Sequence, residues 1–116
     1  MNARNIYAAL FISLSSAAPS TGAVTLYEVN CTVIEVATLA NRVHIRCAPT
    51  ETPFWSFFSV PTSNSAESGR LVTLGTAAMT TGRPVRVTYD LTDFSAEAFG
   101  CVSSNCRRPL SVALAR

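Results

Sequence analysis

Apolar and polar residues alternate along the first part of the segment Leu26–Val36. This spacing is typical of a β-strand with one buried and one exposed face. The alternation changes phase at Val33–Ile34, where two apolar residues are adjacent. We expect a β-bulge or a strong bend at that point of the first strand.

Four further segments have strand-like patterns. Arg42–Cys47 alternates strictly, Phe54–Val60 is rich in aromatic residues and lies between two prolines, and the later segments are Arg83–Leu91 and Leu110–Leu114. In the last segment the pattern places Leu110, Val112 and Leu114 on one face of the strand.

The segment between the third and fourth strands has helical spacing. Apolar residues recur there at intervals of three or four positions: Leu71, Leu74 and Ala78. Ser63 or Ser65 could be the N-cap, and Gly82 is well placed to end the helix. Gly69 and Gly75 weaken the helix, so we expect it to depend on packing. Its small residues would also allow close approach to another helix.

The predicted order is therefore three strands, one helix and two strands, which is the element order of an OB-fold. We predict a mostly β fold, a five-stranded OB-fold barrel with one α-helix between strands 3 and 4. Residues 24–116 would form this single domain, since that length suits one domain. A core of this size is small, so disulfides or oligomerisation should help to stabilise it.

Residues 1–23 resemble a bacterial export signal. Arg4 supplies a short positive region, and Ile6–Ala18 is apolar but too short for a stable membrane anchor. Cleavage is expected before Val24, and cleavage after Ala18 is an alternative. The mature protein would then be secreted or periplasmic. No later stretch of the sequence is long and apolar enough for a membrane span.

Four cysteines in a small exported domain indicate two disulfides. Cys31 and Cys47 both lie on the apolar face of their strands, and a turn near 39–41 would bring them opposite each other. Cys101 and Cys106 close a short loop. Among the three possible pairings we therefore predict Cys31–Cys47 and Cys101–Cys106.

The sequence contains no convincing catalytic or metal-binding pattern. His44 is the only histidine and lies on the polar face of its strand, and no nucleophile motif accompanies it. The cysteine spacing matches no zinc pattern, and no cofactor is expected. The acidic residues are scattered, so a small hydrolase is the least favoured hypothesis.

The chain is nearly neutral. The full sequence has a formal net charge of +2, and loss of Arg4 with the signal would lower it by one. Such a charge argues against a nucleic-acid partner.

The aromatic segment around Trp55 has two interpretations. Its residues could fill the core, or an outward aromatic such as Trp55 could stack on a sugar or contact a neighbouring subunit. Phe57 and Phe58 are adjacent, so they cannot face the same side of a strand. The core interpretation is favoured for the cluster as a whole.

The segment Thr80–Asp90, with the sequence TTGRPVRVTYD, resembles the corresponding stretch in the B subunit of subtilase cytotoxin, an AB5 toxin. Four other features agree in order: the export signal, a cysteine that ends the second strand, an aromatic segment before the helix, and a C-terminal cysteine pair. The resemblance extends over roughly residues 26–106 but is dense only over Thr80–Asp90.

This resemblance implies a secreted, non-enzymatic OB-fold subunit that assembles as a homopentamer. It implies host glycans, including sialylated ones, as ligands, and a catalytic A subunit as a possible partner. In the family the helices line a central pore, and a serine of the first strand contacts the sugar. A rough alignment places Asn30 at that serine position, with Glu28 beside it. We therefore expect Glu28, Asn30 and Trp55 to contact the glycan.

The alternative hypothesis is a monomeric exported OB-fold module that binds a protein or peptide. A free sheet edge or the pair Arg107–Arg108 would then be the contact surface.

Overall fold

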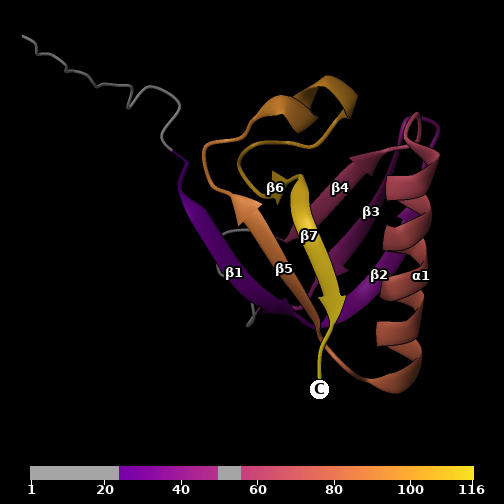
Figure 1. The fold of residues 1–116 in the computed structure, drawn as a ribbon. Coiled ribbons are helices and arrows are strands. Elements are labelled where there is room, and N and C mark those ends of the chain that lie inside the picture. The colour runs from indigo at the N-terminus through magenta and orange to yellow at the C-terminus, as the bar shows by residue number, and fades with distance from the viewer. Residues whose placement is uncertain (1–23, 50–55) are drawn as a thin grey trace, which may run out of the picture.

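The computed structural model describes residues 24–49 and 56–116 (Figure 1). Its strands are β1 (Leu26–Cys31), β2 (Val33–Thr38), β3 (Arg42–Cys47), β4 (Phe57–Pro61), β5 (Val85–Asp90), β6 (Cys106–Arg107) and β7 (Pro109–Leu114). The helix α1 (Ser65–Thr81) lies between β4 and β5, and the short 3-10 helix η2 (Ser95–Phe99) follows β5.

The strands form two open sheets, with the orders β1-β5-β7 and β2-β3-β4-β6. All pairings are antiparallel except β4 with β6. The helix α1 stands alongside the four-stranded sheet, and the loop with η2 lies at the end of the strands opposite the C-terminus (Figure 1). The domain is thus a small mixed α/β fold, and no closed barrel is found among residues 24–49 and 56–116.

The first predicted strand is divided into two strands that belong to different sheets. β1 ends at Cys31 and pairs with β5, whereas β2 begins at Val33 and pairs with β3. The register of β2 against β3 shifts between Val33 and Glu35. The irregularity expected from the change of phase at Val33–Ile34 is therefore confirmed.

The main core lies between α1 and the inner faces of the two sheets. Its largest fully buried side chains include Phe58, Ile45, Leu71 and Val60. In α1 the buried positions are Leu71, Gly75 and Ala78, which face the sheet. Gly75 and Ala78 therefore pack against the sheet of their own chain, so they do not lie on a face that could contact another helix.

Both predicted disulfides are confirmed. Cys31 and Cys47 are joined with a Cα–Cα distance of 5.1 Å, and Cys101 and Cys106 with one of 5.3 Å. The first disulfide lies where β1 passes into β2, so it links the junction of the two sheets to the end of β3.

Two local details differ from the sequence prediction. The N-cap of α1 is Asn64, whose side chain accepts a hydrogen bond from the backbone N–H of Glu67 at 3.0 Å, so neither serine takes that role. Leu110 is 57% exposed, because the register of β5 against β7 shifts between Thr88 and Tyr89. That shift takes Leu110 off the face that Val112 and Leu114 share, so the predicted common face is wrong for Leu110.

Candidate functional site

Glu28 and Asn30 lie on the outward face of the three-stranded sheet, where β1 meets β5. In the antiparallel register Glu28 is opposite Thr88, and Asn30 is opposite Arg86. Directly opposite residues share one face of a sheet, with Cβ atoms about 5 Å apart. The structure therefore brings both predicted site residues together with a cation and a hydroxyl that the sequence prediction had not included.

This polar cluster, formed by Glu28, Asn30, Arg86 and Thr88, is open to solvent. Thr88 is half-buried and the other three residues are exposed. Within residues 24–49 and 56–116, no hydrogen bond or ion pair engages the side chains of Glu28, Asn30 or Arg86. Two carboxylate oxygens, one amide and one guanidinium are thus available to a ligand.

The strand-opposite residues Arg86 and Thr88 could not be identified from the chain alone, because they become neighbours of Asn30 and Glu28 only through the β1–β5 pairing. Trp55, the third predicted contact, lies outside the described residues.

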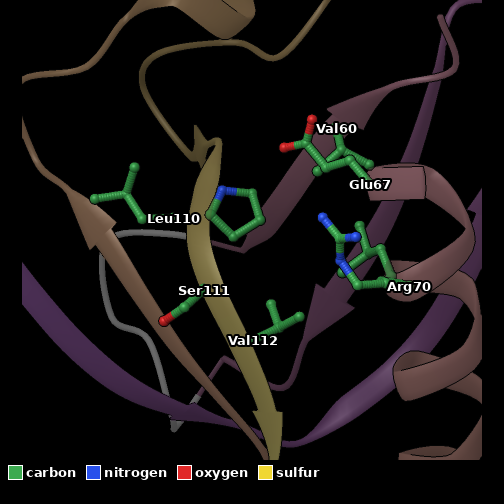
Figure 2. Close-up of a pocket in the computed structure, with 8 residues that line it drawn as sticks. Val60, Glu67, Arg70, Leu110, Ser111 and Val112 are labelled. Atoms are coloured by element: carbon green, nitrogen blue, oxygen red, sulfur yellow. The ribbon is translucent and has the colours of Figure 1, made fainter. Parts of the chain in front are cut away.

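A second candidate surface is the groove between α1 and β7, which has a volume of about 250 Å³ (Figure 2). Val60 and Leu71 form an apolar floor, and both are only 1% exposed. Val112 points across the groove toward the helix, whereas Ser111 points to the other side of β7 (Figure 2). β7 is also an end strand of its sheet among the described strands.

The charged groups of this groove, which we call the α1–β7 groove, are unequally engaged. Glu67 accepts two hydrogen bonds from Arg108, from Nη2 at 2.6 Å and from Nε at 3.0 Å. This hydrogen bonding raises the pKa of Arg108 above its ordinary value. In the described part of the chain Arg70 has no ion pair or side-chain hydrogen bond. The groove therefore has one cation free for a ligand. Arg107, by contrast, is 4% exposed and donates to backbone carbonyl groups.

His44 is not a solvated residue, contrary to the simplest interpretation of its strand face. Its Nε2 atom lies 3.0 Å from Oε1 of Glu35, and its ring packs edge-on against Phe57 at 5.0 Å. Ser59 is opposite His44 in the β3–β4 register, but it is 1% exposed and its hydroxyl lies 3.3 Å from the Cys106 sulfur. A buried hydroxyl in contact with a disulfide is poorly placed to attack a substrate.

The part of the chain that the structure covers contains no cluster of three or more side chains suited to a metal ion. It also contains no helix that is long and apolar enough to cross a membrane. All four cysteines are in disulfides, so none of them is a free thiol.

Comparison with known proteins gives no match: no protein-family model, no curated protein and no solved structure is significantly similar to this chain. The function must therefore be argued from the sites themselves.

Proposed function

We propose that this protein is a secreted, non-enzymatic glycan-binding subunit, similar in role to the B subunit of an AB5 toxin. The observation that carries the proposal is the polar cluster of Glu28, Asn30, Arg86 and Thr88. Its groups share one exposed sheet face and are not satisfied by neighbouring side chains in residues 24–49 and 56–116. The two disulfides favour an oxidising location outside the cytoplasm.

The dimensions of the polar cluster suit a single sugar unit. Opposite residues are about 5 Å apart across the strands, and residues two apart on one strand are separated by roughly 7 Å. Glu28 can accept hydrogen bonds from sugar hydroxyls, and Asn30 can both donate and accept. Arg86 can bind a carboxylate with two parallel hydrogen bonds, which favours an acidic sugar such as sialic acid.

An OB-fold is the architecture proposed for this domain. Its support is the bent first strand, whose two halves β1 and β2 join different sheets, and the position of α1 between β4 and β5. The parallel contact of β4 with β6 brings the strand before α1 together with the segment that leads into β7. We expect this pattern of strand pairings if the two sheets are parts of one distorted OB-fold barrel.

A homopentamer is the assembly proposed with this function, with a catalytic A subunit as a further partner. Among the described strands, β2 ends one sheet and β7 ends the other. Pairing of two different edges between copies would be a heterologous contact, which generates a ring when the rotation closes. A ring would also compensate for weak single-site binding by multivalency.

A glycan array probed with the oxidised mature protein tests this proposal. We expect binding to acidic glycans, and we expect Arg86→Gln to weaken it by at least about tenfold, since a charged hydrogen-bonded contact is lost. Arg46→Gln is the matched control, because Arg46 is exposed on β3 in the other sheet. No binder above background, or equal loss in both variants, would refute the glycan-binding proposal.

The second candidate function is a monomeric exported module that binds a peptide. The α1–β7 groove favours it, because an apolar floor and the unpaired Arg70 lie beside a sheet-end strand. An extended acidic segment could add to β7 and contact that cation. The native mass of the oxidised protein separates the two: about five chains favours the ring, and a clean monomer favours the peptide-binding module.

A further inference from the structure

A separate pocket of about 170 Å³ lies between the β3–β4 hairpin and the loop closed by the Cys101–Cys106 disulfide. The residues that line it are Arg42, His44, Phe57, Ser59, Gly100, Val102, Asn105 and Cys106. They come from three segments that are far apart in the sequence. The pocket is therefore formed only when the chain is folded.

Arg42 is half-buried and reaches the backbone of the disulfide loop at Phe99 and Gly100. Its Nη1 atom lies 3.4 Å from the carbonyl oxygen of Phe99 and 3.4 Å from Oδ1 of Asn41, which are both long contacts. A Cβ atom added to Gly100 would lie only 2.5 Å from Nη1, so a larger residue there would push the end of the Arg42 side chain aside. Gly100 also has a φ of +96°, which favours glycine on its own. The guanidinium therefore lies against the loop backbone, and most of its donors have no short partner in the described chain.

The other polar groups complete a recognition site. The side-chain amide of Asn105 has no hydrogen bond within the described residues, although its carbonyl oxygen on the backbone accepts two. Ser59 has only its contact with the Cys106 sulfur. The nearby carboxylate of Glu35 is already engaged by His44. Arg42 is therefore the lining group whose positive charge is uncompensated.

The rest of the pocket has a mainly apolar lining, which comes from Phe57, the exposed Val102 and the disulfide-bonded Cys106. Its volume is close to that of an apolar cavity of roughly 150 Å³ that admits a benzene molecule. We propose that this pocket binds a small monocarboxylate, with its apolar body against Phe57 and Val102 and its carboxylate on Arg42. The inference is independent of the glycan-binding proposal, which concerns the other sheet.

The chemistry of each partner supports this assignment. The Arg42 guanidinium can pair with both oxygens of a carboxylate through two parallel hydrogen bonds. The side-chain amide of Asn105 can donate a further hydrogen bond to the same oxygens. The pocket is too small for a peptide segment, so a free acid of about benzoate size is the expected ligand.

A titration of the isotope-labelled, oxidised domain with sodium benzoate, followed by amide chemical shifts, tests the proposal. We expect saturable shifts centred on residues 42–44, 57–59 and 100–106. Benzamide, a neutral molecule of nearly the same shape, should bind at least about tenfold more weakly, because it cannot form a charge-assisted pair.

Variants then test the role of Arg42. Arg42→Gln should weaken benzoate binding by at least about tenfold, whereas Arg42→Lys should retain part of the affinity because the charge remains. Arg116→Gln removes one exposed cation elsewhere and should leave binding unchanged. Thermal unfolding of each variant establishes that it is folded. Equal binding of benzamide, unchanged binding by a folded Arg42→Gln, or no saturable shifts in the wild type would overturn the proposal.

Discussion

Replacement of Gly75 by alanine should destabilise the domain relative to the same replacement at Gly69. Gly75 is buried where α1 packs on the four-stranded sheet. An alanine Cβ there would lie 2.8 Å from Cγ2 of Val36 and 2.9 Å from Cγ2 of Ile45. Both neighbours are β-branched and have restricted χ1 angles, so they cannot easily move away. At Gly69 nothing lies within 4 Å of an added Cβ.

The magnitude follows from two opposing effects. Alanine is favoured over glycine in a helix interior by about 0.8–1.0 kcal/mol, and this gain applies to both positions. Overpacking of a well-packed core costs about 1–3 kcal/mol, and it applies only at Gly75. Gly69→Ala should therefore stabilise the domain by about 1 kcal/mol. Gly75→Ala should range from nearly neutral to about 2 kcal/mol less stable than the wild type.

Urea unfolding of the oxidised mature domain measures both variants. The difference between them isolates the steric cost, because the helix-propensity gain cancels, and it should be about 1–3 kcal/mol. Gly75→Ala should cost less in a Val36→Ala background than in the wild type, since Val36→Ala removes both γ-methyl groups, including the crowding Cγ2. Equal stabilisation by the two alanines would refute the close approach of α1 to β2 and β3.

Three further predictions concern the disulfide, the helix C-cap and acid stability. Replacing Cys31 and Cys47 by alanine should lower the free energy of unfolding by about 2–4 kcal/mol, because the disulfide between these cysteines, 16 positions apart, closes a substantial loop. Urea unfolding measures this, and unchanged stability would contradict it. Gly82→Ala should lower the free energy of unfolding by about 1–2 kcal/mol in the same assay, since alanine is disfavoured at the C-cap φ of +72°. A gain in stability would contradict the left-handed cap. Asp90 accepts hydrogen bonds from the N–H and hydroxyl of Thr92, and these lower its pKa below 3.8. The Asp90 carboxylate therefore stabilises the fold above about pH 4, and this stabilisation is lost as the pH falls through the lowered pKa. The difference in free energy of unfolding between the wild type and Asp90→Asn should shrink on acidification. A constant difference between pH 6 and pH 2 would refute this.

The sequence was a good guide wherever a feature depends on neighbouring residues. The strict alternation of Arg42–Cys47 predicted β3 with the correct bounds, and the glycine at position 82 ends α1 as expected. The pairing of both disulfides also followed from local spacing. The short strand β6 was missed, because two residues are too few to show a period.

Features that depend on distant segments could not be predicted. Leu110 was wrongly placed on one face with Val112 and Leu114, because a register shift between β5 and β7 leaves no trace in the apolar pattern of either strand. Arg86 joins the predicted residue Asn30 only through the β1–β5 pairing. The α1–β7 groove and the pocket around Arg42 are likewise formed by segments that are distant in the sequence.

The two disulfides are both short-range, with sequence separations of 16 and 5 residues. The alternative pairings would join cysteines more than fifty positions apart, and closing such long loops costs more chain entropy. Cys31 can also meet Cys47 as soon as the β2–β3 hairpin forms, before β5 and β7 are in place. Oxidation should therefore reach the native pairing directly, and the chain should mature without catalysed disulfide reshuffling.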